Sequence, residues 1–273
     1  MTAAEPAVAA SADGAGRSAP VIVLTYGQAG VRRLQAFLDG QPELACTTAT
    51  GLLAACDQAA TAWRQAERRP AGQLSTLAVT SLRALANGMI TTITAQAGRP
   101  RWCEITAAER TAAETFLQVF PATRFVCLHR AFPDVAFAVL NANPWGLAGP
   151  GFAAYTAAHP ASTLAALAAW WAGHTTQILA FEQDHPGACL RIRYEDLAED
   201  PDVAEHDIRG FLGLNEFLAA VPALPGETAG GPSGADAPGC GAGIPAAQLP
   251  PLLCNQVNNL HARLGYPPLP PTS

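Results

Sequence analysis

The sequence contains no lysine, so all 16 of its basic residues are arginines. Its 22 acidic residues leave a formal net charge of −6 at pH 7. An acidic chain does not offer the broad basic surface that nucleic acids and anionic membranes usually require. We therefore expect no nucleic-acid partner, although a few local arginines could still form a compact site for an anion.

Long apolar runs and paired cysteines are also absent. No window reaches the roughly 18 continuous apolar residues of a membrane span, and residues 1–20 have no basic start or long apolar run of a signal peptide. The seven cysteines include no CxxC pair and give no sign of a disulfide framework or a zinc site. We expect a soluble, cytoplasmic protein without a metal and without a membrane partner.

With 273 residues, 49% of them hydrophobic, the chain can bury the core of one α/β domain. We expect a single domain between two tails, with a glycine-rich flexible insertion late in the domain. The corresponding ranges are a flexible tail over 1–19, the domain over 20–268, the insertion over 226–245 and a tail over 269–273. Amphipathic helices are expected over 52–68 and 74–93, and further helices over 164–181 and 249–266.

The first informative segment begins with the apolar run VIVL at Val21, which predicts a buried strand followed by a turn and an amphipathic helix. Gly27 and Gly30 in the turn would let backbone amides approach a phosphate. The Walker pattern GxxxxGKS/T is absent, because no lysine or hydroxyl follows the second glycine. A nucleoside triphosphatase is therefore disfavoured.

In a second segment, a strand predicted over 124–128 runs directly into Arg130, and Pro133 and Asp134 are typical of the first turn of a helix. Unpaired amides at a helix start favour anions, so we expect them to form a phosphate or sulfate site together with the Arg130 guanidinium. The alternative is an arginine on a surface loop. His129 should face away from Arg130 by strand alternation, which favours a structural role.

A third segment, residues 189–214, reads CLRIRYEDLAEDPDVAEHDIRGFLGL and predicts a strand, an acidic turn and a short helix. In this order the three segments resemble bacterial sulfotransferases that use 3'-phosphoadenosine 5'-phosphosulfate (PAPS). The family loop P-K/R-S-G-T-T-x-L corresponds to residues 27–34, the segment F-P-D-A-R-F-V-x-L-x-R-D-P-x-D-V to 120–135, and RYEDL to 193–197. A weaker match, WCEIT over 102–106, lies where relatives carry W-G-E-K-T-P.

The resemblance implies an α/β, P-loop-like sulfotransferase fold, in which helices flank a central, mainly parallel sheet. It implies PAPS as the donor, with Arg130 binding the 3'-phosphate and the loop binding the 5'-phosphosulfate. Carried over residue by residue, the cofactor-binding positions are Gly27, Gln28, Ala29, Gly30, Val31, Arg32, Arg130, Ala138 and Tyr194.

Several of these positions depart from the family pattern. Gln28 replaces the cation that acts on the transferring sulfonate, Ala29 and Val31 replace hydroxyls, Ile105 replaces a lysine and Ala138 replaces a serine. We expect Arg32, at the start of the helix, to take the place of the missing cation. The alternative is that Arg32 and Arg33 are solvated first-turn residues, although arginines there oppose the helix dipole unless an anion is bound.

Four residues are candidates for the base that accepts the acceptor's proton: Glu104, Glu109, His129 and His174. We prefer Glu104, at the end of the strand predicted over 101–105, which with Arg32 and Gln28 gives the expected catalytic set. The alternative is a carboxylate paired with Arg101 or Arg130.

The loop over 141–160 and the helix after it carry aromatic residues that could form an acceptor pocket. The adjacent Trp170 and Trp171 cannot share a helix face, so we expect one in the core and the other facing the cleft or a partner. The expected pocket residues are Trp102, Trp145, Phe152, Tyr155, Trp170 and His174.

Two functions remain open from the sequence. The first is transfer of a sulfonate from PAPS to a hydroxyl or amine of a small, partly apolar acceptor. The second is a sulfotransferase-like protein without transfer activity that serves as a partner subunit of a homo- or hetero-oligomer, as a binding module, or as a catalyst of another reaction such as sulfate elimination.

Overall fold

A five-stranded parallel sheet forms the centre of the protein. The computed structural model describes residues 19–26, 30–70, 72–107, 109–143, 147, 151–215, 239 and 248–270. Its strands are ordered β2-β3-β1-β4-β5, and every strand pair within these residues is parallel. The strands are β1 (Val21–Leu24), β2 (Leu44–Thr48), β3 (Arg101–Thr106), β4 (Arg124–His129) and β5 (Cys189–Arg193). The predicted α/β fold with a mainly parallel sheet is confirmed.

The strand order places β1 in the middle of the sheet. The chain runs outward through β2, returns to β3 beside β1, and then crosses to β4 on the other side of β1. The register pairs Leu24 with Thr106 of β3 and with Cys127 of β4, so the carboxyl ends of these strands lie at one edge. Ligands of open α/β sheets bind at this edge, where the strand order changes direction.

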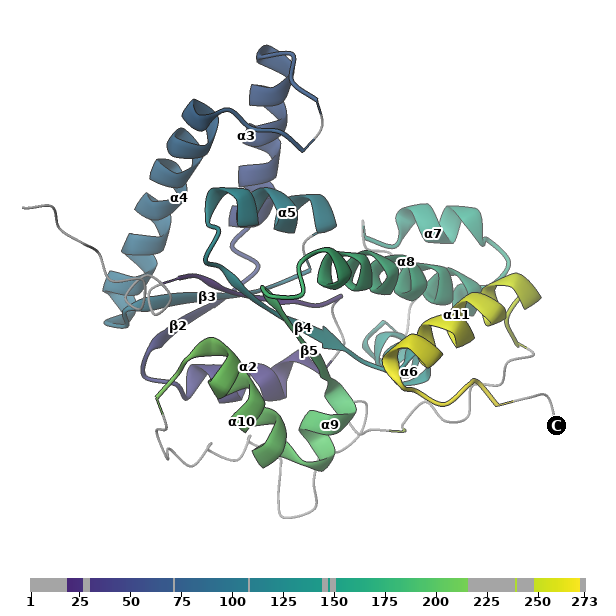
Figure 1. The fold of residues 1–273 in the computed structure, drawn as a ribbon. Coiled ribbons are helices and arrows are strands. Elements are labelled where there is room, and N and C mark those ends of the chain that lie inside the picture. The colour runs from purple at the N-terminus through teal and green to yellow at the C-terminus, as the bar shows by residue number, and fades with distance from the viewer. Residues whose placement is uncertain are drawn as a thin grey trace, which may run out of the picture.

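Helices cover both faces of the sheet, which explains why β1, and β4 after its exposed first residue, are buried continuously rather than at alternate residues. Figure 1 shows one group of helices above the sheet and another group below it. Those above are α3 (Leu52–Ala66), α4 (Thr76–Ala97), α5 (Arg110–Val119) and α8 (Thr163–Asp184), and those below are α2 (Val31–Asp39), α9 (Tyr194–Glu199) and α10 (Pro201–Leu212).

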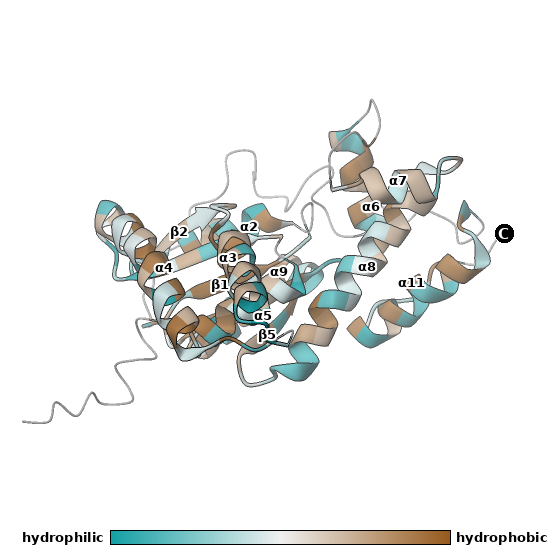
Figure 2. Cartoon of the chain, turned by 90° about the horizontal axis from the view of Figure 1, so that it is seen from above, coloured by the Kyte–Doolittle hydropathy of each residue, from teal (hydrophilic) through white to brown (hydrophobic). Residues whose placement is uncertain are grey.

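The remaining helices gather around α8 on one side of the molecule. Both views show α6 (Phe132–Ala142), α7 (Ala153–Ala158) and α11 (Pro251–Leu264) beside α8, on the side to which β4 leads (Figure 2). The carboxyl edge of the sheet therefore faces this helical group. Residues that follow β1 and β4 can contact α8 directly.

The helices expected over 52–68, 74–93, 164–181 and 249–266 correspond to α3, α4, α8 and α11. The sequence patterns gave no prediction for β2 or α5, and α7 lies inside the segment expected to be a loop. Ala19 and Leu269, the innermost residues of the two expected tails, pack against the domain. Ala19 is buried and its carbonyl accepts a hydrogen bond from Arg101, while buried Leu269 donates its amide to Asn258. Of the insertion predicted over 226–245, only Gly239 lies within the described residues.

Candidate functional site

Gly30 begins α2, just after β1, in a conformation that suits glycine. Its φ of +80° lies in the left-handed region. A Cβ atom built there would lie 2.0 Å from two ring carbons of Tyr194, so any side chain would overlap this ring. The first described residue after the β1 turn therefore packs directly against the residue that follows β5. Gly27, Gln28 and Ala29 lie outside the described residues.

The same tyrosine ring also contacts Arg130, the residue that follows β4. The guanidinium carbon of Arg130 lies 4.5 Å from the centre of the Tyr194 ring. Arg130 is fully buried and Tyr194 is 1% exposed. The ends of three neighbouring strands, β1, β4 and β5, thus meet at one ring. Gly30, Arg130 and Tyr194, three of the predicted nucleotide-binding residues, lie together.

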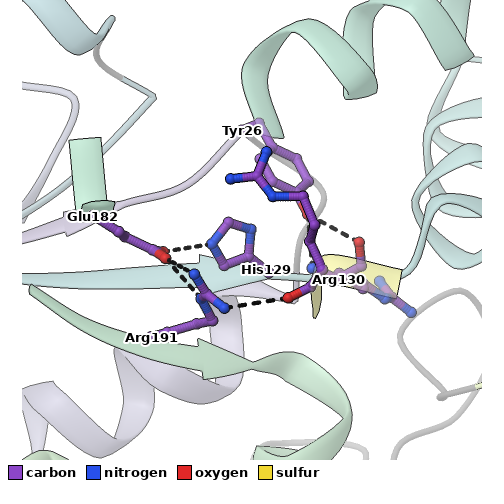
Figure 3. Close-up of polar contacts among 6 residues, drawn as sticks. Tyr26, His129, Arg130, Glu182 and Arg191 are labelled. Atoms are coloured by element: carbon purple, nitrogen blue, oxygen red, sulfur yellow. Dashed lines mark hydrogen bonds and ion pairs between the residues drawn. The ribbon is translucent and has the colours of Figure 1, made fainter. Parts of the chain in front are cut away.

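The side chain before Arg130 points the other way, as strand alternation predicts. His129 is fully buried, and its Nε2 lies 2.7 Å from Oε1 of Glu182 on α8. Glu182 also accepts a hydrogen bond from Arg191 of β5, and Figure 3 shows its carboxylate in contact with both His129 and Arg191. Burial alone would raise the pKa of Glu182, but His129 and Arg191 outweigh it and hold this pKa below its ordinary value. These contacts tie β4 and β5 to α8.

The start of α6 does not offer its amides to an anion in the way the sequence suggested. The Ala131 amide donates to Oε1 of Glu195 at 3.0 Å, and the Phe132 amide donates to Nε2 of His261 at 3.2 Å. Pro133 has no amide hydrogen. The partial positive charge of this helix start thus attracts a carboxylate and an imidazole of the chain itself. This part of the prediction is corrected, because the Ala131 and Phe132 amides are paired within the chain.

A cavity of about 360 Å³ lies beyond this helix start. It is lined by Asp134 and Glu195, and by a proline-rich segment that includes Tyr266. Burial raises the pKa of Glu195. Because two carboxyl groups line this cavity, it does not suit a phosphate, and it is distinct from the junction of Gly30, Tyr194 and Arg130.

The two arginines of α2 lie in different surroundings. Arg32 is exposed in the first turn of the helix. Arg33 is half-buried, and its charge counteracts the burial that raises the pKa of Glu205 on α10. Of these two, Arg32 therefore faces solvent at the start of α2. Two further predicted cofactor positions are apolar: Val31 is half-buried, and Ala138 is buried within α6.

Glu104 is 1% exposed and is held by two threonines. Thr47, its register partner on β2, donates to Oε2 at 2.7 Å. The amide and hydroxyl of Thr50 donate to Oε1 at 2.8 and 2.9 Å. The carboxylate therefore braces the turn that follows β2. The suggested pairing with Arg101 or Arg130 is wrong, because Arg101 donates to the carbonyls of Ala19 and Leu212 and Arg130 lies over Tyr194.

Four of the predicted acceptor-pocket residues form one aromatic cluster between α7 and α8, which we call the α7–α8 cluster: Phe152, Tyr155, Trp170 and His174. The Trp170 ring lies 4.8 Å from Phe152 and 5.1 Å from His174, and Tyr155 lies 6.2 Å from His174. Trp170 also meets Tyr26 edge to face at 6.1 Å. The cluster therefore reaches the end of β1.

The two adjacent tryptophans point to different sides, as expected, but both are buried. Trp171 is fully buried and donates to the carbonyl of Arg130, whereas Trp170 is 7% exposed and belongs to the α7–α8 cluster. Trp102 lies elsewhere, since it packs against Phe116 and donates to Thr47. Trp145 lies outside the described residues.

His174 has a defined tautomer when it is neutral. Its Nδ1 lies 2.9 Å from the Trp170 carbonyl, which can only accept, so Nδ1 carries the hydrogen. Nε2 is then the basic nitrogen of the ring. His174 is half-buried within the α7–α8 cluster, so this arrangement presents a proton acceptor among aromatic side chains. Glu109, the remaining candidate, precedes α5 and its side chain forms no cap for that helix.

Two further properties concern the described part of the chain. None of its helices combines the length and the apolar character needed to cross a bilayer. Within the same residues, no three His, Cys, Asp or Glu side chains are grouped closely enough to hold a metal ion.

Comparison with known proteins gives a consistent assignment of fold. Residues 20–217 match the model of the Sulfotransferase family. The sulfotransferase domain of the curacin biosynthetic pathway is similar in structure, with a TM-score of 0.59 at 16% identity over 93% of this chain and 99% of that domain. The sulfotransferase domain of the Synechococcus PCC 7002 olefin synthase gives a TM-score of 0.56 at 16% identity over 92% and 96%. A sulfotransferase from Alicyclobacillus acidocaldarius gives 0.51 at 13% over 91% and 96%. No curated protein sequence matches the chain.

Proposed function

Because the chain belongs to the sulfotransferase family, we propose that it transfers a sulfonate group from PAPS to a hydroxyl or amine of a small acceptor. The observation that carries this proposal is the junction of Gly30, Tyr194 and Arg130 at the carboxyl ends of three strands. A fully buried guanidinium beside a close-packed glycine suits a nucleotide with phosphates at both ends.

In this proposal Arg130 holds the 3'-phosphate, and the backbone around Gly30 holds the 5'-phosphosulfate. The acceptor oxygen or nitrogen attacks the sulfur, the bond from sulfur to the 5'-phosphate oxygen breaks, and adenosine 3',5'-bisphosphate leaves. Such transfer depends on positioning and on charge stabilisation, as phosphoryl transfer does. Since the chain has no lysine, Arg32 and the neutral donor Gln28 are the proposed groups beside the transferring sulfonate.

Two residues are proposed as the base that takes the acceptor's proton. Glu104 has the position in the central motif, but both of its oxygens already accept hydrogen bonds from Thr47 and Thr50. His174 has a basic Nε2 and lies among the proposed acceptor-binding aromatics. Removal of the true base should lower kcat about 100- to 10,000-fold.

Calorimetric titration with adenosine 3',5'-bisphosphate tests the nucleotide site. We expect the wild-type protein to bind, and Arg130→Ala to weaken binding by about 1.5–3 kcal/mol, or about 10- to 150-fold. Arg124→Ala is a matched control, because Arg124 lies at the opposite end of the same strand and bonds the Gly187 carbonyl. Lack of binding by the wild-type protein at millimolar nucleotide would overturn the proposal.

A second function is favoured by two apolar residues at positions that are polar in the family pattern. Ile105 is 4% exposed and Ala138 is 2% exposed, at positions where the resemblance implies a lysine and a serine. A sulfotransferase-like protein without transfer activity would bind the bisphosphate nucleotide through Arg130 yet release none from PAPS with any acceptor. Measuring release of adenosine 3',5'-bisphosphate from PAPS across an acceptor panel separates the two functions.

A further inference from the structure

The residue before the β1 turn, Tyr26, holds the backbone of Arg130. Its hydroxyl donates to the Arg130 carbonyl at 2.9 Å and accepts from the Arg130 amide at 2.7 Å. One hydroxyl thus engages both backbone groups of the same residue, 104 positions further along the chain. Figure 3 shows Tyr26 and Arg130 side by side.

The hydrogen bonds from Tyr26 satisfy the Arg130 backbone at a point where the strand pairing of the sheet has already ended. The β1–β4 ladder stops at Leu24 and Cys127, and the β4–β5 ladder stops at His129 and Arg193. Arg130 is fully buried, so its backbone groups need partners within the protein. Tyr26 engages the amide and the carbonyl, and Trp171 on α8 adds a second donor to the carbonyl at 3.0 Å.

Tyr26 is itself fixed on several sides. It is 1% exposed, and its ring lies 6.1 Å from Trp170 and 6.4 Å from His129. Burial raises the pKa of Tyr26, so the hydroxyl stays protonated and remains a donor. Tyr26 lies one position before Gly27 in the sequence, and its ring contacts the α7–α8 cluster.

We propose that Tyr26 is a positioning residue that fixes Arg130 relative to the β1 turn and the α7–α8 cluster. The donor nucleotide, bound at both of its ends, and the acceptor are thereby held in fixed positions relative to each other. This inference rests on the proposed function. Tyr26 acts through Arg130 and does not take part in the chemistry. A displacement of the strand end by about 1 Å would misplace the guanidinium, because its planar fork must match a phosphate.

The test uses Tyr26→Phe, which keeps the ring and removes only the hydroxyl. Thr123→Val is the matched control, since it removes a buried hydroxyl bonded to the Phe120 carbonyl at the far end of β4. Each protein is measured by calorimetry with adenosine 3',5'-bisphosphate, by thermal unfolding, and by hydrogen exchange at the Arg130 amide. We expect Tyr26→Phe to weaken nucleotide binding by about tenfold or more and to speed exchange at this amide by a similar factor. Thr123→Val should bind and exchange there like the wild type.

Several outcomes overturn the inference. One is a folded Tyr26→Phe protein with affinity within twofold of wild type and unchanged exchange at Arg130. Another is an equal loss of affinity in Thr123→Val, which would indicate general destabilisation. If Tyr26→Phe does not fold, exchange in the wild-type protein decides, because an Arg130 amide that exchanges as fast as an exposed loop has no such contact. If the wild-type protein binds no nucleotide, the proposed function fails, while exchange at Arg130 in the two variants still decides whether Tyr26 holds this strand end.

Discussion

Replacement of Gly30 by alanine should be far more damaging than an ordinary glycine substitution. The structure gives two separate reasons. The first is the φ of +80°, a left-handed conformation that costs a residue with a side chain about 1–2 kcal/mol. The second is the Tyr194 ring, which lies 2.0 Å from the position of the added Cβ. This ring is buried, so it must shift, and overpacking of this kind typically costs about 1–3 kcal/mol.

Gly51→Ala separates the two contributions. Gly51 begins α3 with a φ of +78°, yet an added Cβ there would meet nothing within 4 Å. We therefore expect Gly51→Ala to destabilise the protein by about 1–2 kcal/mol and Gly30→Ala by about 2–5 kcal/mol. At roughly 2–4 °C per kcal/mol for a domain of this size, Tm should fall by about 2–8 °C and 4–20 °C respectively.

Differential scanning calorimetry of both variants measures these shifts, and titration with adenosine 3',5'-bisphosphate measures the effect on the site. Displacement of Tyr194 also displaces the group beneath the Arg130 guanidinium, so Gly30→Ala should lose at least tenfold in affinity while Gly51→Ala should not. The reasoning is refuted if Gly30→Ala is no less stable than Gly51→Ala, or if both bind the nucleotide equally.

Three further predictions concern charge and proton transfer. Arg32→Ala should lower the transfer rate about 100-fold or more with little change in Tm, because Arg32 is exposed; wild-type turnover would exclude Arg32 as the substitute cation. Of Glu104→Gln and His174→Ala, the variant of the true base should lose kcat by about 100-fold or more at similar KM. If Glu104→Gln mainly lowers Tm instead, the role of Glu104 is to brace the turn that follows β2. Because the folded-state pKa of Glu182 is lowered, its ionised form adds stability above the unfolded pKa that is lost as pH falls through the folded pKa. As pH falls from about 5 to about 3, Glu182→Gln should therefore show a smaller drop in Tm than the wild type, and equal drops would contradict this assignment.

The fold was predictable wherever local pattern and motif coincided. The apolar runs of β1 and β4 and the motif that follows β5 lie between recognisable turns, and these three strands carry Gly30, Arg130 and Tyr194 to one edge of the sheet. The short strand β2, LACTT, has no apolar alternation, and α5 begins at Glu109 without a side-chain cap, so neither gives a strong local signal.

Contacts between distant segments could not be predicted. Glu195 reaches the Ala131 amide across 64 positions, and Tyr26 reaches Arg130 across 104. Thr47 and Thr50 meet Glu104 only because β2 lies beside β3. No sequence spacing encodes these pairs. The sequence does show that Tyr26 directly precedes a glycine-containing turn. The role of its hydroxyl, however, depends on where β4 lies in the fold, which no local pattern predicts.

A crystal structure of the protein with adenosine 3',5'-bisphosphate is the most direct test of the central claim that one nucleotide links the β1 turn to Arg130. We expect the 3'-phosphate within hydrogen-bond distance of the Arg130 guanidinium and the 5'-phosphate at the amides beside Gly30. A nucleotide found elsewhere, for example in the cavity beside Tyr266, or bound without contact to Arg130, would contradict the account.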